Sequence, residues 1–123
     1  MYGELHGTST ARVATDRPAR YAKQLVSHFG NHNDGHWSDD DARGDLSFVG
    51  EGEASENPKK AFEGKVHVSF VAAEQTLLIH IEGPERLIER FEQVVGKHLV
   101  RFGAKDGLHV QWRRSNGEAG TSQ

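Results

Sequence analysis

The sequence predicts an α+β fold in which an antiparallel sheet of five or six strands carries two helices on one face. Apolar residues recur at helical spacing along 87–102 and again along 21–29, so each segment is expected to bury one side of a helix. Between them, 66–70 and 77–81 alternate apolar and polar residues and are joined by a short turn, which demands antiparallel pairing. The expected order is β-α-β-β-β-β-α-β.

The first half of the chain begins with an expected strand at 12–15. A helix follows, with Pro18 in its first turn, where the missing N–H is not needed, and with Gly30 at its end. The segment 31–45 is rich in Asn, Asp, Gly and His, which favours turns on either side of a short strand near 36–39.

The second half resumes with a strand at 46–49. Residues 50–64 are polar and contain several glycines and a proline, which predicts a long mobile loop. After the hairpin, the second helix begins behind Pro84, and alternation at 108–112 predicts a final strand.

A chain of 123 residues suits one domain. We expect a single α+β domain at 10–114, with 1–9 as a flexible N-terminal segment and 115–123 as a disordered C-terminal tail.

Composition excludes several classes of function. The chain has no cysteine, so disulfides, thiolate metal sites and cysteine nucleophiles are absent. Its net charge of -3, with both signs interspersed, gives no basic field for nucleic acid. No apolar run is long enough to span a bilayer. We therefore expect a soluble, cytoplasmic protein with neither nucleic acid nor membrane as a partner.

Three histidines at a spacing of four form the first candidate site. On an unbroken helix His28, His32 and His36 would share one face and could bind a divalent transition metal, the only cofactor that the sequence suggests. Gly30 and Gly35 favour turns and interrupt that geometry. The alternative is a turn that is merely rich in histidine.

A second candidate site involves His98, which lies in the apolar stripe of the second helix. Since both helices share one sheet face, His98 could meet His28, with Arg101 as a clamp for an anionic ligand. The alternative is a histidine at the edge of the core that donates a hydrogen bond to a backbone carbonyl.

The third candidate site lies on the strands. His67, His80 and His109 alternate with apolar residues, so they are expected on the open face of the sheet. Neighbouring strands would place them in one row, able to bind a metal or an acidic partner. The alternative is an ordinary solvated sheet face.

Several dipeptides resemble a known family. They are Arg20-Tyr21, Gln24-Leu25 and His28-Phe29 on the first helix, Val94-Val95, His98-Leu99 and Arg101-Phe102 on the second, and the closing Gly107-Leu108 and Val110-Gln111-Trp112. Across about 11–112 the chain is similar to the small bacterial domain-of-unknown-function family 2218. The resemblance implies a small α+β domain with no established activity, sometimes attached to siderophore-interacting flavoprotein modules and hence linked to iron uptake. The chain departs from the family at 31–34, where a basic residue is usual, and in a longer loop at 50–64.

No complete catalytic motif or cofactor loop is present, so three functions remain open. The leading hypothesis is a non-enzymatic accessory or binding domain that presents a histidine-bearing site to a small ligand, metal or partner protein. The second is a metal-dependent enzyme that uses His28, His32 and His98. The third is a structural module that covers its sheet face against another copy as a homodimer.

Overall fold

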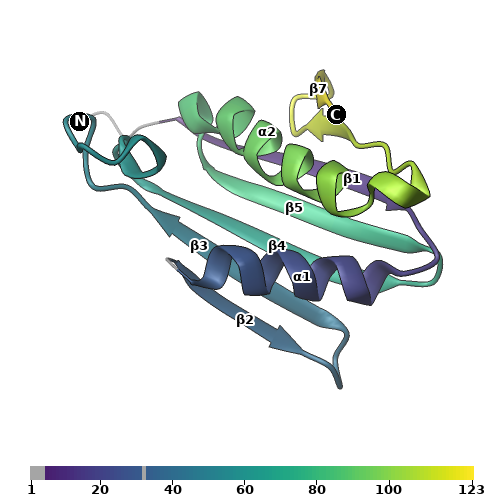
Figure 1. The fold of residues 1–123 in the computed structure, drawn as a ribbon. Helices are drawn as coiled ribbons and strands as arrows, with labels where there is room; N and C mark the ends of the chain where they lie inside the picture. Colours follow the sequence, from purple (N-terminus) through teal and green to yellow (C-terminus); the bar gives the residue numbers. More distant parts are fainter. Residues whose placement is uncertain (1–4, 32) are drawn as a thin grey trace.

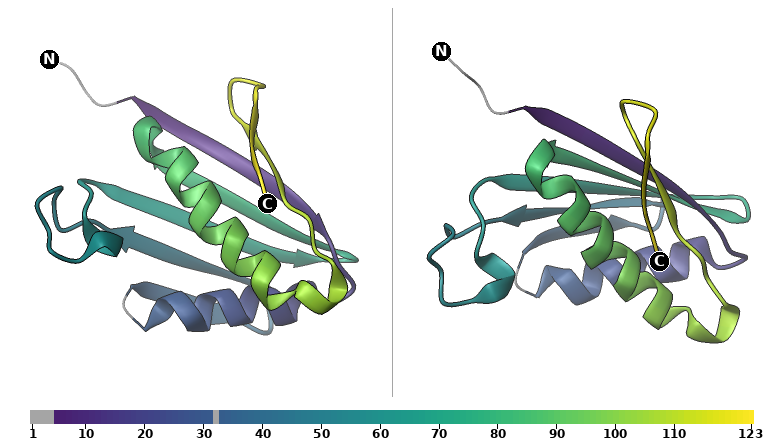
Figure 2. Two further views of the ribbon diagram at one scale, coloured as in Figure 1. Left: turned by 45° about the horizontal axis from the view of Figure 1, so that its top comes forward. Right: turned by 90° about the horizontal axis from the view of Figure 1, so that it is seen from above.

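The computed structural model describes residues 5–31 and 33–123, and Figure 1 shows two helices lying over one sheet. In chain order the elements are β1 (His6–Ala14), α1 (Pro18–Gly30), β2 (Asp34–Ser38), β3 (Arg43–Val49), the short 3₁₀ helix η1 (Pro58–Lys60), β4 (Lys65–Ala73), β5 (Thr76–Pro84), α2 (Glu85–Phe102), the 3₁₀ helix η2 (Ala104–Asp106), β6 (Gln111–Arg114) and β7 (Ala119–Ser122). Both helices cover the same face of the sheet (Figure 2). The predicted α+β class is confirmed.

The described strands form one sheet in the order β2-β3-β4-β5-β1-β6-β7, and every neighbouring pair is antiparallel. The first strand of the chain therefore lies near the middle, between β5 and β6. The sheet has seven strands where the sequence predicts five or six, because the end of the chain adds a strand.

Both ends of the domain differ from the expectation. Residues 6–9, expected to be flexible, belong to β1 and pair with β5, while residues 1–4 lie outside the described residues. Residues 119–122, expected in a disordered tail, form β7 against β6. The alternation rule misses β7 because it carries no large apolar residue; backbone pairing and the side chain of Glu92 hold it instead.

Alternation places the core on the helix side of the sheet. The apolar strand residues that are at most 1% exposed are Ala11, Val13, Leu46, Val66, Val68, Phe70, Leu77, Ile79, Ile81 and Trp112. Polar and half-exposed residues occupy the other face, as expected for an antiparallel sheet with one solvated side.

The two helices bury the stripes that the sequence indicates. α1 buries Tyr21, Ala22, Leu25 and Val26, and α2 buries Leu87, Ile88, Phe91, Glu92, Val95, Gly96 and Leu99. Each large apolar side chain contributes about 1.5–3 kcal/mol when it leaves water. Val94, His98 and Phe102 remain partly exposed at the edge of the α2 stripe. Neither helix of the described segments is long and apolar enough to cross a membrane.

The loop at 50–64 is tied to the rest of the fold at several points. Phe62 is only 2% exposed and packs in the core, and its carbonyl accepts a hydrogen bond from Gly52. Arg90 of α2 donates to the carbonyls of Pro58 (2.8 Å) and Ala61 (3.3 Å). These contacts hold η1 beside the two helices, where it borders a cavity.

Candidate binding site

A cavity of about 440 Å³ lies where the end of α1, the middle of α2 and the loop around η1 meet. This volume is within the range of pockets that take small organic molecules. Its lining consists of aromatic, basic and amide side chains with one proline and one valine: His28, Phe29, Asn31, Asn33, Phe48, Asn57, Pro58, Lys59, Lys60, Arg90, Phe91, Val94 and His98.

Three phenylalanines form the apolar wall of the cavity. The ring centroids of Phe29 and Phe48 lie 5.3 Å apart at 74°, and those of Phe48 and Phe91 lie 4.9 Å apart. Such edge-on and tilted pairs are the favoured arrangement of aromatic side chains. The rings come from α1, β3 and α2, so the wall is built on regular elements and is well suited to a flat apolar ligand.

Basic groups form the rim, and no Asp or Glu is among the thirteen lining residues. Besides its two carbonyl partners, the Arg90 guanidinium stacks near the ring of Phe62, with Cζ 5.0 Å from the ring centroid. A guanidinium has five N–H groups, so Arg90 keeps donors beyond the two that hold the loop. Lys60 donates to Oδ1 of Asn33 at 2.8 Å, and Lys59 adjoins it on η1. The rim is therefore positive.

The structure brings His28 and His98 together, with ring centroids 5.0 Å apart. The ring of His98 also packs edge-on against Phe29 at 4.8 Å. Its Nδ1 lies 2.7 Å from the carbonyl oxygen of Val94, one helical turn earlier. The two interpretations of His98 that the sequence allows are thus compatible. One ring nitrogen is hydrogen-bonded within α2, and the ring still packs against His28. Ligand binding by the pair stays a prediction.

The electrostatic environment keeps His28 neutral. Burial lowers its pKa below the usual 6.5, and repulsion from His98 in its protonated form, from Lys59 and from Arg101 lowers the pKa further. All these influences disfavour a second positive charge at this point. Near neutral pH, His28 therefore offers an uncharged imidazole beside cationic neighbours.

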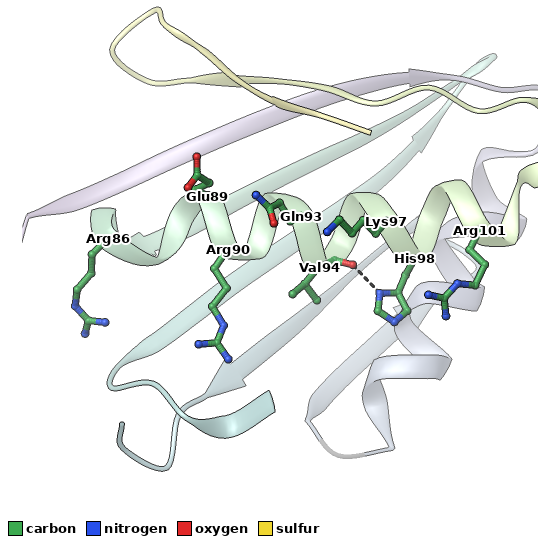
Figure 3. Close-up of a pocket in the computed structure, with 8 residues that line it drawn as sticks. All are labelled: Arg86, Glu89, Arg90, Gln93, Val94, Lys97, His98 and Arg101. Atoms are coloured by element: carbon green, nitrogen blue, oxygen red, sulfur yellow. Dashed lines mark hydrogen bonds between the residues drawn. The ribbon is translucent and has the colours of Figure 1, made fainter. Parts of the chain in front are cut away.

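A shallow groove continues from the cavity along the outer side of α2 (Figure 3). It shares Arg90, Val94 and His98 with the cavity. Arg101, the predicted anion clamp, lies in this groove rather than in the cavity, and Lys97 lies there too. Positive charge therefore extends from the rim onto the exposed surface of α2.

The predicted metal site at His28, His32 and His36 is not assembled as expected. A side chain at Gly35 would point toward Leu46 and α1, so His36, the next residue of β2, points to the opposite face of the sheet from His28. His32 lies outside the described residues. Within 5–31 and 33–123, no group of three or more His, Cys, Asp or Glu is placed to hold a metal ion.

The sheet-face histidines do not form a row of three. His67 lies opposite Glu82 and His80 lies opposite Ser69, so the two are only diagonal neighbours. Hydroxyl groups lie near their Nδ1 atoms, from Ser47 for His67 (3.2 Å) and from Thr10 for His80 (2.9 Å). His109 precedes β6 and lies outside the strands. Binding at this face stays a prediction.

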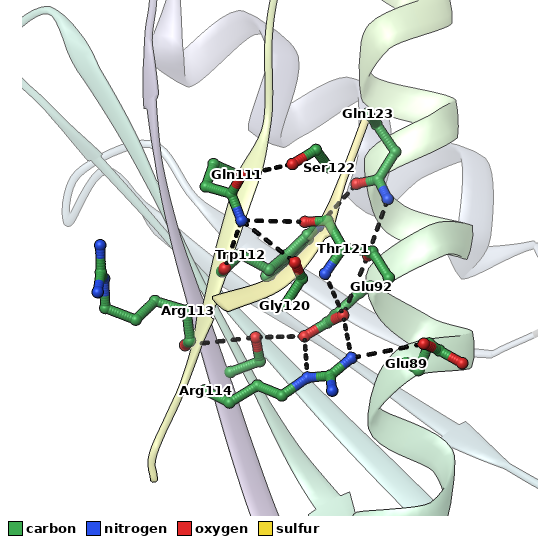
Figure 4. Close-up of polar contacts among 11 residues, drawn as sticks. Glu89, Glu92, Gln111, Trp112, Arg113, Arg114, Gly120, Thr121, Ser122 and Gln123 are labelled. Atoms are coloured by element: carbon green, nitrogen blue, oxygen red, sulfur yellow. Dashed lines mark hydrogen bonds and ion pairs between the residues drawn. The ribbon is translucent and has the colours of Figure 1, made fainter. Parts of the chain in front are cut away.

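The other flank of α2 carries a polar cluster that the sequence analysis missed (Figure 4). Glu92 is fully buried, and its carboxylate accepts hydrogen bonds from Ser9 (2.7 Å), from Arg114 (3.0 and 3.1 Å) and from the backbone and hydroxyl of Thr121 (both 3.0 Å). Burial raises the pKa of Glu92, but these hydrogen bonds together outweigh burial and lower it. Since α2, β1, β6 and β7 all meet here, the cluster is structural.

Sequence reasoning also missed most of the cavity. Lys59, Lys60 and Arg90 enter it only because the loop at 50–64 folds back over α2. One signal was available: Phe62 is the only large apolar residue in that loop, and such a residue is expected to anchor its segment to the core.

The fold and the cavity define a small two-layer α+β domain with a pocket between its helices and a tethered loop. A family model matches residues 10–113, and the chain belongs to that family, DUF2218, described as an uncharacterized protein conserved in bacteria. The NMR structure of PA4090 from Pseudomonas aeruginosa shares 22% identity, covers 86% of this chain and 94% of its own, and aligns with a TM-score of 0.60, which shows a common fold. No curated protein matches the chain.

Proposed function

We propose that this domain binds a small organic anion with an aromatic or other flat apolar body in the cavity between α1, α2 and η1. One observation carries the proposal: three phenylalanine rings form one wall, while the described rim residues include two lysines, an arginine and two histidines and no acidic side chain. Ligand pockets combine apolar area with a few polar groups that fix orientation. Here those polar groups select negative charge.

The lining supports recognition rather than a hydrolytic reaction. Its thirteen described residues include no Ser, Thr, Cys, Asp or Glu, so neither His28 nor His98 has a hydroxyl or thiol nucleophile or an orienting carboxylate beside it among them. The asparagines are used in part to hold the loop, since Asn57 caps η1 and Asn33 accepts from Lys60. The proposed role is that of a binding or accessory domain.

Phenylacetate and two isosteric relatives test the charge requirement. We expect phenylacetate to bind and to shift the backbone amide resonances of 28–31, 33, 57, 59, 60 and 90–98 in ¹H–¹⁵N spectra. Phenylacetamide should bind at least tenfold more weakly because it lacks the charge, and phenethylamine should not bind. Equal affinity for the acid and the amide, or no shift with either, would overturn the proposal.

A pair of lysine variants localises the binding. Lys59→Ala removes an exposed cation from the rim and should weaken phenylacetate binding about two- to fivefold, as expected for loss of a solvent-screened charged contact. Lys105→Ala makes the same change on the exposed η2, away from the lining, and should leave affinity unchanged. Equal losses in both variants would indicate nonspecific attraction instead of a site.

The family resemblance implies a link to iron uptake, in which case the anion bound in the cavity would be a siderophore. Ferric and iron-free siderophores, added in competition with phenylacetate, would test it, and failure of both to compete would remove that link while leaving the anion site intact. The homodimer also stays a proposal. Sedimentation velocity tests it by giving the mass of the protein in solution.

A further inference from the structure

We propose that the ligand also donates a hydrogen bond, from a hydroxyl or N–H group on its aromatic body, to Nε2 of His98. This inference rests on the proposed function and names its ligand class: phenolic or indolic aromatic acids. It makes His98 a specificity-determining residue and leaves the attraction of the anion to the basic rim.

The hydrogen bond within α2 fixes the tautomer of His98. Its Nδ1 lies 2.7 Å from the carbonyl oxygen of Val94. A carbonyl oxygen can only accept, so Nδ1 must carry the proton and donate. In the neutral ring Nε2 then has a lone pair and acts as an acceptor. Packing against Phe29 at 4.8 Å and His28 at 5.0 Å holds the ring in this orientation.

The Nε2 atom is open to a ligand. No hydrogen bond to Nε2 is made by residues 5–31 or 33–123, yet those residues contain no buried side-chain nitrogen or oxygen without a partner. Nε2 is therefore accessible rather than sealed. Figure 3 shows this nitrogen on the side of the ring turned away from Val94 and α2, and His98 lines both the cavity and the adjoining groove.

Two other side-chain acceptors in the cavity already have a donor. The Oδ1 atom of Asn33 accepts from Lys60, and that of Asn57 accepts from the backbone of Lys59. Lysine and arginine side chains can only donate. A ligand whose only polar group is its anion would interact with the basic rim. It would leave Nε2 of His98 without a donor, facing the apolar ring of the ligand.

The positions of the two contacts suit one small molecule. Arg90 and His98 lie eight residues apart on α2, which corresponds to roughly 12 Å along the helix at 1.5 Å per residue. Both side chains line the same cavity, with Phe91 and Val94 between them in sequence. An aromatic acid can thus place its carboxylate near the rim and its ring donor near His98.

Matched ligand pairs test the inference. 4-Hydroxyphenylacetate and 4-methoxyphenylacetate differ in one hydrogen-bond donor, as do indole-3-acetate and 1-methylindole-3-acetate. We expect the member of each pair that carries the hydrogen-bond donor to bind about tenfold more tightly than its methylated relative. Equal affinity within both pairs would overturn the inference while leaving the anion site standing, whereas no binding by any of the four would overturn both proposals.

Variants assign the preference to His98. His98→Phe should abolish the preference while keeping the affinity for 4-methoxyphenylacetate, and His98→Gln, which retains an acceptor, should restore part of it. Lys59→Ala should weaken both members of a pair equally. A preference that survives in His98→Phe overturns the inference.

A spectroscopic readout on the unaltered protein does not depend on the folding of a variant. The ¹⁵N resonance of His98 Nε2 should shift with 4-hydroxyphenylacetate more than with its methyl ether. Equal shifts would count against the inference.

Discussion

The two flanks of α2 use polar residues in opposite ways. On one flank Glu92 is fully buried, and Ser9, Arg114 and Thr121 supply donors to its carboxylate. On the other flank, Arg90 and His98 are half-buried, and each keeps hydrogen-bonding capacity beyond its contacts with backbone carbonyls. The first flank, here called the closed flank, holds α2 against its neighbouring strands. The second, the open flank, keeps hydrogen-bonding groups available for a ligand.

This contrast indicates that charge alone is a weak reason to propose a binding site. The Glu92–Arg114 pair is the stronger electrostatic feature, yet the carboxylate is fully buried and its hydrogen bonds are all made within the fold. The cavity has weaker individual contacts but leaves donors and an acceptor available. Free hydrogen-bonding capacity beside apolar area is the better guide to binding.

Breaking the closed flank should have the largest effect. Glu92→Ala removes the main acceptor of the partly buried Arg114 and of the Ser9 hydroxyl, so we expect a loss of about 3–5 kcal/mol in the free energy of unfolding, measured with urea. The folded fraction should still bind phenylacetate, because the cavity lies on the other flank.

Glu89→Ala is the matched control. Glu89 is on the same helix and lies 3.8 Å from the same Arg114, but its side chain is 66% exposed. The loss should stay below about 1 kcal/mol. Comparable losses in the two variants would mean that burial of the Glu92 cluster is not what stabilises this flank.

Gly50→Ala should disturb the open flank to an intermediate degree. A Cβ at Gly50 would lie 1.9 Å from the carbonyl oxygen of Phe62, so the backbone of the loop must move. We expect a loss of about 1–3 kcal/mol in stability. Phenylacetate affinity should fall as well, because the same loop carries Lys59. Unchanged unfolding in urea would show that the loop adapts freely.

Gly96→Ala should have a smaller effect on the closed flank. Its Cβ would lie 1.8 Å from Oε1 of Gln123, but that atom ends a flexible side chain that can turn away. The move breaks the hydrogen bond from Trp112 Nε1 to Gln123, which costs about 1 kcal/mol, while alanine gains about as much in helix propensity. Urea unfolding should change by less than about 1 kcal/mol, with an altered emission of Trp112. A loss as large as that of Gly50→Ala would contradict this reasoning.

The smallest expected effect is the pH dependence due to His28. Its pKa in the folded protein is lowered below the usual 6.5, chiefly by burial and then by neighbouring positive charge. As pH falls below 6.5 the unfolded chain takes up a proton first, so stability decreases on acidification and is unaffected at higher pH. His28→Gln should flatten the stability profile just below pH 6.5. An unchanged slope there would assign the effect to another group.

Local patterns were sufficient to predict most of the fold. Both helices end at the predicted Gly30 and Phe102, and the hairpin at 66–70 and 77–81 forms as expected, because spacing and end signals are encoded within each segment. The meeting of His28 and His98 was also predictable, since both helices must cover the same sheet face.

Features that depend on distant partners were not predictable in this way. Glu92 occupies a position four residues after Ile88 and three before Val95, which places it beside the apolar stripe, but its partners lie 22–83 residues away. The strand β7 has no apolar alternation, and it is held by its pairing with β6 and by the hydrogen bonds of Thr121 to Glu92. The cavity likewise requires the loop to fold back, which no local pattern describes.

The central place of β1 has a consequence for how the chain assembles. β1 pairs with β5, beginning at His6 and Pro84, and with β6 near the other end of the sequence. Contacts between distant segments carry a large loop-closure cost and form late. We therefore expect the meander β3–β4–β5 to form first and β1 to insert afterwards, so pulse-labelled hydrogen exchange should protect amides of β4 before those of β1. During synthesis, β1 must wait for nearly the whole domain to follow it before it finds both neighbours.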